Sequence, residues 1–145
     1  MFRSILMPVD GSMQSYKPMQ AAIDLAKLTS GRLIVLSVAE PRLFNGADAD
    51  SVKTGRTVED MRMHDAKAHV QKVLDHAEAM NVRCEAVVSL SRLPDEEILE
   101  AVREFQCDVI VMATRGKMGV LDTLFSESLT QEVIRKSMVP VLVFP

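Results

Sequence analysis

The residues best suited to chemistry follow the apolar run 108–112. The sequence continues Ala-Thr-Arg-Gly-Lys-Met-Gly over 113–119, and three hydroxyl residues come soon after: Ser126, Ser128 and Thr130. If the run is a strand and the hydroxyl residues open a helix, then free backbone N–H groups, close approach at glycine, and the cations Arg115 and Lys117 favour an anion such as phosphate. The alternative is a turn made by glycines, a helix capped by Ser128, and two solvated cations. The segment holds neither the GxxxxGK[ST] nor the GxGxxG phosphate motif.

A second candidate is the carboxylate of Asp10, which follows the apolar run 3–9. At the carboxyl end of a strand, a carboxylate can accept a hydrogen bond from a ligand hydroxyl or hold a cation. Alternatively, Asp10 caps the first helix or starts a turn, as Asp-Gly pairs often do. We do not expect covalent phosphoryl chemistry, because Ser12 stands where an aspartate-dependent phosphatase has its second acid.

The other groups typical of active sites have the spacing of structural residues. His69 and His76 share a face of one expected helix but lie about 10 Å apart along its axis, so we expect no metal site. Cys84 and Cys107 form no CxxC pair. Together with an N-terminus too weakly apolar for a secretion signal, they indicate reduced thiols and a cytoplasmic protein. The acidic run 95–97 favours a helix start and is interpreted as structural.

Alternating apolar runs and helical segments must position these groups. We expect strands at 3–9, 32–38, 82–89, 108–112 and 139–144, and helices at 15–29, 58–80, 95–105 and 129–136. Four of the runs are continuous, as in strands buried on both faces, whereas 82–89 alternates and is expected at an edge. This order predicts an α/β fold with a single doubly wound domain over residues 1–145.

Two local features complete the expected path of the chain. Gly31 is interpreted as the stop signal of the first helix. Residues 40–56 are polar and rich in Gly and Asp, and we expect a surface loop there.

In a doubly wound parallel sheet, ligands bind beyond the carboxyl ends of the strands, where the strand order reverses. We therefore expect the site near Asp10 and the 113–119 segment.

The composition argues against two classes of partner, nucleic acids and membranes. The chain has 145 residues, 17 basic and 20 acidic side chains, and a net charge of -3, so it lacks the basic character of nucleic-acid binders. Aromatic residues make up 4%, too few for a base-stacking platform. Its apolar runs are strand-sized, shorter than a membrane span. We expect neither nucleic acid nor membrane as a partner.

Five segments in this order resemble the universal stress protein family, in its small single-domain bacterial type. They read ILMPVDGS (5–12), LIVLSVAEP (33–41), LPDEEILEAV (93–102), CDVIVMATRG (107–116) and SLTQEVIRKSMVPVLVFP (128–145). The resemblance covers essentially the whole chain. It implies a five-stranded parallel sheet with helices on both faces, a Rossmann-like fold of the adenine-nucleotide alpha-hydrolase type. It also implies a cytoplasmic stress-response or regulatory protein.

The resemblance further implies a nucleotide site and a homodimer. The ligand would be ATP, with or without Mg²⁺, and the expected nucleotide-binding residues are Pro8, Asp10, Val38, Met112, Ala113, Arg115, Gly116, Lys117, Ser128, Leu129 and Thr130. The dimer would form through the last strand, at Val141, Leu142 and Val143. An apolar edge strand is by itself a template for a second chain, although a loop that covers the strand is the alternative.

The family's ATP motif is only partly kept. It reads Gly, two residues, Gly, nine residues, Gly, then Ser or Thr. Here Ala113 and Glu127 occupy the first and third glycine positions, Gly116 and Ser128 match, and the gap between Gly116 and Glu127 holds ten residues. A carboxylate beside a triphosphate repels it. The alternatives are thus the family's branch that binds no nucleotide and acts through protein contacts, or a slow ATPase; we do not expect an enzyme.

Overall fold

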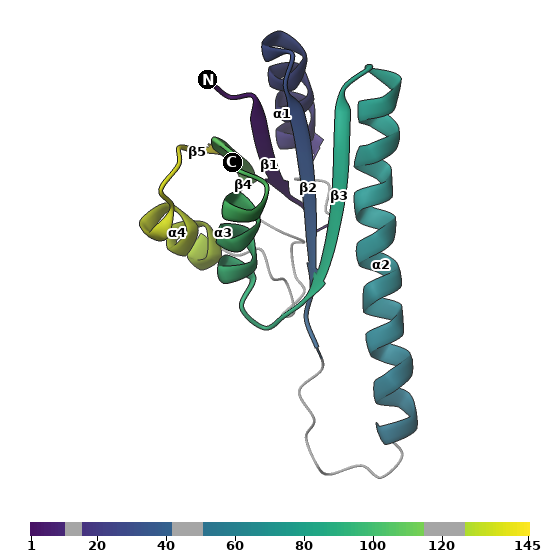
Figure 1. The fold of residues 1–145 in the computed structure, drawn as a ribbon. Coiled ribbons are helices and arrows are strands. Elements are labelled where there is room, and N and C mark those ends of the chain that lie inside the picture. Colours follow the sequence, from purple (N-terminus) through teal and green to yellow (C-terminus); the bar gives the residue numbers. More distant parts are fainter. Residues whose placement is uncertain (11–15, 42–50, 115–126) are drawn as a thin grey trace.

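Strands and helices alternate through the described part of the chain, as the expected order requires (Figure 1). The computed structural model describes residues 1–10, 16–41, 51–114 and 127–145. The elements are β1 (Ser4–Pro8), α1 (Tyr16–Thr29), β2 (Arg32–Ala39), α2 (Ser51–Ala79), β3 (Arg83–Leu90), α3 (Pro94–Glu104), β4 (Val109–Ala113), α4 (Glu127–Lys136) and β5 (Val141–Phe144). Each expected strand and helix is confirmed, most with ends shifted by one or two residues.

The start of α2 differs most from the expectation. This helix begins at Ser51, so residues 51–56 of the expected loop are helical, while 42–50 lie outside the described residues. The expectation relied on polarity and on Gly55. One glycine in an exposed helix costs only about 1 kcal/mol, which a long helix that packs elsewhere tolerates.

The five strands form one parallel sheet in the order β3-β2-β1-β4-β5. β1 is therefore central, and β3 and β5 are the edges, which confirms the edge position expected for 82–89. The register aligns one row across the sheet, from Glu85 through Ile34, Leu6 and Ile110 to Val141. Strand order reverses between β1 and β4, because the chain adds β2 and β3 on one side of β1 and then β4 and β5 on the other.

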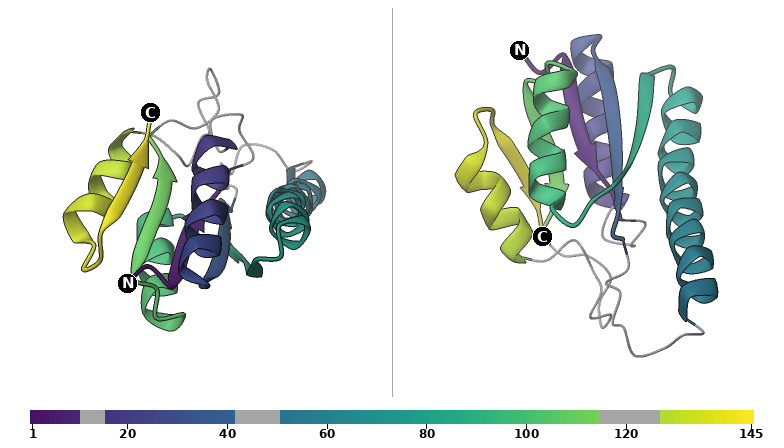
Figure 2. Two further views of the ribbon diagram at one scale, coloured as in Figure 1. Left: turned by 90° about the horizontal axis from the view of Figure 1, so that it is seen from above. Right: turned by 60° about the horizontal axis from the view of Figure 1, so that its bottom comes forward.

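Helices cover both faces of this sheet (Figure 2). Odd-numbered strand residues such as Ile5, Leu33 and Val109 pack with the buried faces of α1 and α2. Even-numbered residues such as Leu6 and Ile34 pack with α3 and α4. Successive side chains of a strand point to opposite faces, so the continuous apolar runs supply both cores at once.

The end of α1 corrects one expectation. The residue in the left-handed conformation is Ser30, with φ 53°, and not Gly31. The Ser30 and Gly31 N–H groups donate to Lys27 O (3.3 Å) and Ala26 O (2.8 Å), which is a Schellman motif. Gly31 serves another purpose: a Cβ there would lie 2.4 Å from Arg3 O, so only glycine lets this turn approach β1.

The same ending recurs at α2 and α3 without glycine. Asn81 and Gln106 have φ 57° and 51°. In each case the next N–H reaches back five residues, from Val82 to Ala77 O and from Cys107 to Val102 O, at 2.9 Å in both. The three helices that lead into β2, β3 and β4 thus return to the amino edge of the sheet through one fixed turn.

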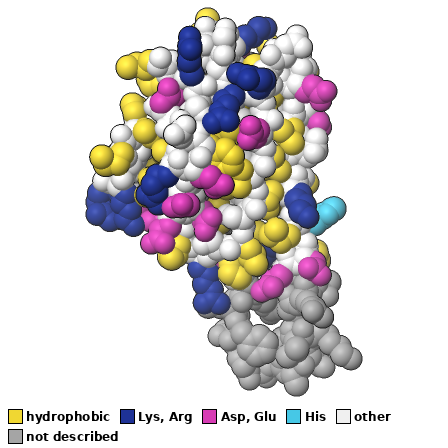
Figure 3. Space-filling model, in the orientation of Figure 1, with side chains coloured by type: hydrophobic (Ala, Val, Ile, Leu, Met, Phe, Trp, Pro, Cys, Tyr) yellow, Lys and Arg dark blue, Asp and Glu magenta, His cyan; other side chains and the backbone are white. Residues whose placement is uncertain are grey.

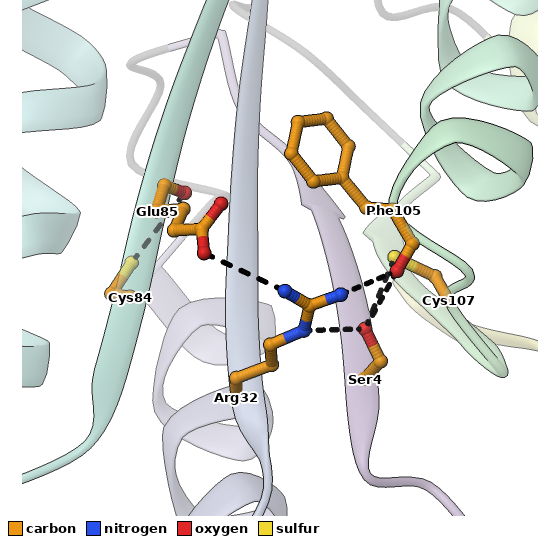
Figure 4. A network of polar contacts seen from close by, with 6 residues as sticks. All are labelled: Ser4, Arg32, Cys84, Glu85, Phe105 and Cys107. Atoms are coloured by element: carbon orange, nitrogen blue, oxygen red, sulfur yellow. Dashed lines mark hydrogen bonds and ion pairs between the residues drawn. The ribbon is translucent and has the colours of Figure 1, made fainter.

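A polar network closes this amino edge (Figure 4). The Arg32 guanidinium donates to Phe105 O (2.6 Å) and Ser4 Oγ (3.2 Å) and lies 3.5 Å from Glu85. Separately, both carboxylate oxygens of Asp108 accept backbone N–H groups, from Arg3 and Ser4, at 3.1 Å each. Side chains thereby join β1, β2, β3 and the turn before β4.

Candidate functional site

At the carboxyl edge, β1 and β4 part. The pairing of β1 with β2 runs on to Pro8–Leu36, whereas its pairing with β4 ends at Leu6–Ile110. Val9 N–H donates to Leu36 O of β2 (2.8 Å), and peptide groups alternate in direction along a parallel strand, so position 8 faces β4. Proline has no N–H to donate, and the ladder to β4 stops there. A local sequence choice therefore opens the sheet at the point where strand order reverses.

The expected site side chains emerge on one face of the sheet. Pro8, Val38 and Met112 each lie two positions beyond a residue of the core under α3 and α4, namely Leu6, Leu36 and Ile110. Asp10 follows Pro8 by two residues and is half-buried. Val38 is 5% exposed and Met112 is fully buried. The structure thus places Pro8, Val38 and Met112 on one face of the sheet at its carboxyl edge, with Asp10 directly after β1.

The start of α4 is fixed to the end of β4 by one buried hydrogen bond. Thr130 is 4% exposed, and its hydroxyl donates to Ala113 O at 3.3 Å. Leu129 is buried in the core under α3 and α4, whereas Ser128 is exposed. The expected hydroxyl pair is therefore split: Ser128 points to solvent, and Thr130 positions the helix.

The exit of β2 is held from three directions. Leu36 O accepts Val9 N–H at 2.8 Å, and Ala39 O accepts Ser91 N–H at 2.9 Å. Glu40 O accepts Arg62 Nη1 at 2.8 Å. Sequence reasoning missed Arg62, because an arginine on a polar helix gives no signal that it reaches a strand end 22 residues earlier.

Several expected site residues lie outside the described residues. These are Arg115, Gly116 and Lys117, so the basic loop stays a prediction. Glu127 is the first residue of α4, but its side chain is not described. Among the described residues, no cluster of three His, Cys, Asp or Glu side chains could hold a metal ion. No helix in this part of the chain is long and apolar enough to cross a membrane.

The two thiols are structural groups with raised pKa values, and the charged surface is mixed in sign. Burial, and then Glu85, raise the pKa of the Cys84 thiol to about 12. Burial also raises the pKa of Cys107, which lies 3.6 Å from Ser4 Oγ in the amino-edge network. Basic and acidic side chains are interspersed over the face in Figure 3. On that face no single sign of charge dominates.

A parallel sheet of order 3-2-1-4-5, whose strand order reverses between β1 and β4, defines a doubly wound α/β protein. Residues 1–145 match the universal stress protein family, and the chain belongs to it. A curated universal stress protein of Synechocystis sp. is 32% identical over 148 residues, covering 100% of this chain and 87% of the relative.

Solved structures share the fold. The universal stress protein UspA of Lactobacillus plantarum gives a TM-score of 0.82 at 18% identity, covering 99% of this chain and 98% of that one. The universal stress protein of Archaeoglobus fulgidus in complex with dAMP gives 0.71 at 19% identity, covering 100% of both chains. Another universal stress protein, in complex with cAMP, gives 0.68 at 19% identity, covering 99% and 96%.

Proposed function

We propose that this universal stress protein is a regulatory protein that binds an adenine nucleotide in the crevice between β1 and β4. The observation that carries the proposal is the parting of these strands at Pro8, above side chains that share one face. The dAMP and cAMP complexes of two proteins of like fold support adenine as the base. Ligand binding at a switch point is the general behaviour of such sheets.

In this proposal each group has a role that its chemistry allows. Pro8 and Val38 pack against the adenine ring, and Asp10 accepts a hydrogen bond from a ribose hydroxyl. Met112, Ala113 and Leu129 contribute backbone groups. The remaining members bind phosphate: Arg115, Gly116, Lys117 and Ser128. Thr130 acts through Ala113, because its hydroxyl already donates there.

The phosphate end is the weaker half of the proposed site. Ala113 and Glu127 replace two glycines of the family's ATP motif, and Glu127 adds a charge that repels phosphate. Mg²⁺ would enter on the phosphates, as this ion usually keeps several waters and few protein ligands. We therefore expect adenosine and AMP to keep most of the affinity that ATP shows.

Calorimetric titration of the purified protein with adenosine, AMP and ATP tests this function, with guanosine as the control base. We expect the adenine compounds to bind and guanosine to bind at least tenfold more weakly. Glu127→Gly should tighten ATP binding more than adenosine binding, because it removes a charge from the phosphate end. If no adenine compound binds at millimolar concentration, the crevice is not a nucleotide site and the branch acting through protein contacts is the better description.

We also propose a homodimer through β5. Pro140 and Phe144 carbonyls accept Ile110 and Thr114 N–H groups of β4, at 2.9 and 2.8 Å. Peptide groups alternate along the strand, so those of Val141 and Val143 point away from β4. The exposed apolar side chains nearby, Ile134, Met138 and Leu142, support burial by a second copy. A two-fold axis would pair the two β5 strands antiparallel.

Sedimentation velocity at tens of micromolar tests the dimer. The double variant Val141→Lys, Val143→Asp should be monomeric or insoluble, whereas Leu28→Lys, on exposed α1 surface, should behave as wild type. A monomeric wild type, or a dimer that survives the double substitution, would overturn the proposed dimer.

We further propose that the chain forms one domain and that the protein acts as a binding protein rather than an enzyme. We also propose a cytoplasmic location, which the two free thiols support.

A further inference from the structure

We propose that Arg62 is a positioning residue for the adenine end of the site: from α2, it fixes the backbone at the exit of β2 that carries Val38. This inference rests on the proposed nucleotide-binding function and adds a residue that makes no contact with the ligand. Arg62 Nη1 donates to Glu40 O at 2.8 Å, and both residues are half-buried. A hydrogen bond from a charged donor in such surroundings is stronger than one between neutral groups.

Three carbonyl anchors at the exit of β2 differ in kind. Leu36 O and Ala39 O are held by backbone N–H groups, from Val9 and Ser91. Of the three anchors, only the Glu40 bond comes from a side chain. It is also the last of the three along the chain. A substitution at Arg62 can therefore change the position of the β2 exit and leave the backbone hydrogen bonds of the sheet in place.

Arg62 reaches the exit from the other side of the sheet. α2 packs with α1 on the odd-numbered strand residues, through Val70, Val73 and Ala77. Val38 belongs to the core on the opposite face, under α3 and α4. A guanidinium on the α2 side acts on the crevice through the chain itself, because Glu40 follows Val38 by two residues. Its effect should thus reach the adenine and not depend on the phosphates.

This geometry sets the test. Arg62→Gln should weaken adenosine, AMP and ATP by the same factor, roughly tenfold, as expected for loss of one charge-assisted hydrogen bond. Arg62→Lys keeps the positive charge but replaces the planar guanidinium with a single ammonium group, and it should recover part of the affinity. The matched control is Lys67→Gln, which removes one exposed positive charge from the same helix and should leave all three affinities unchanged.

A second readout works without any ligand. The Ser91 amide is protected by Ala39 O, one residue before Glu40, so its hydrogen exchange should be at least about fivefold faster in Arg62→Gln than in Lys67→Gln. This separates the two hypotheses. If the wild type binds no adenine compound but the exchange of Ser91 changes as expected, the nucleotide function fails and the anchor stands.

The opposite results overturn the inference. If the loss of affinity in Arg62→Gln increases from adenosine to ATP, Arg62 contacts phosphate directly. Unchanged affinity together with unchanged Ser91 exchange would show that the Glu40 bond positions nothing. If Arg62→Gln does not fold, the comparison of Arg62→Lys with wild type decides on the same two readouts. Equal affinity and equal exchange in that pair would likewise reject a positioning role that depends on the planar guanidinium.

Discussion

The amino and carboxyl edges of the sheet differ in how their backbone groups are bound. At the amino edge, three helices return through left-handed turns, and Arg32 and Asp108 bind carbonyl and N–H groups of neighbouring segments. At the carboxyl edge, β1 and β4 separate at Pro8, and the exit of β2 is held at three carbonyls. The comparison indicates that the amino edge contributes stability, whereas the carboxyl edge carries the site proposed above.

This division follows from where the polar groups find partners. At the amino edge they are satisfied within the protein, so substitution there should cost folding free energy. At the carboxyl edge Pro8 has removed a donor that would have closed the sheet. Substitution there should change binding with little change in stability. Three variants test this division, and a fourth lies outside both edges; they follow from the largest expected effect to the smallest.

The largest effect should come from Gly31→Ala at the amino edge. A Cβ at this position lies 2.4 Å from Arg3 O and 2.8 Å from Arg3 Cα, so backbone must move. We expect a loss of about 3 kcal/mol in the free energy of unfolding, in the range of overpacked sites. Urea denaturation measures it. Leu28→Ala, at an 84% exposed position of the same helix, should cost less than about 0.5 kcal/mol.

Asp108→Ala should be the next most damaging change. It removes the acceptor of the Arg3 and Ser4 N–H groups, and we expect a loss of about 2 kcal/mol. Asp108→Asn keeps one acceptor oxygen and should lose about half as much. Thermal unfolding of the pair provides the measurement. Equal stability of both variants and wild type would mean that the amino edge is not held by this carboxylate.

Pro8→Ala tests the open edge directly. The new N–H can donate toward β4 and extend the pairing past Leu6, so the crevice should narrow. We expect adenosine affinity to fall about tenfold, while the free energy of unfolding stays within about 1 kcal/mol of wild type. Calorimetry and urea denaturation on one preparation decide. A variant with lower stability and unaltered affinity would contradict the division between the edges.

The smallest effect concerns Asp95, which joins α3 to α4 and belongs to neither edge. Its hydrogen bond to Lys136, at 2.8 Å, lowers the pKa of the Asp95 carboxyl. A lowered folded-state pKa stabilises above the ordinary value of about 3.9, and this contribution disappears as pH falls through the folded-state pKa. The stability difference between wild type and Asp95→Asn should therefore be present at pH 6 and vanish toward pH 2. Asp60→Asn, on an exposed part of α2, is the control for the loss of one carboxylate.

The sequence predicted the fold well because the fold rests on apolar pattern. Continuous runs such as 32–38 indicated buried parallel strands, and the alternating run 82–89 indicated the edge. The glycine stop was assigned wrongly at Gly31, because the need for glycine there comes from a backbone contact with Arg3, 28 positions away. Such contacts leave no local pattern.

The site was predicted less completely, for a related reason. The residue types at strand ends point to the carboxyl edge of the sheet, and this location stays a prediction, because the roles of single groups depend on geometry. The sequence indicates Thr130 as a phosphate ligand, but it does not indicate that the Thr130 hydroxyl donates to Ala113 O. Arg62 carried no signal at all, since its partner is a backbone carbonyl. Contacts between a side chain and the main chain cannot be inferred from residue identity.

The strand order has a consequence for how the chain folds. β1, β2 and β3 are consecutive in sequence and adjacent in space, whereas β4, the other neighbour of β1, is made about 100 residues after it. A growing chain that ends after Leu90 holds three paired strands and the helices of one face only. Leu6, Ile34 and Leu36 then present an apolar surface until α3 and α4 are made. Synthesis thus passes through an interval when this half of the core is bare, and the interval ends once α3 and α4 are made.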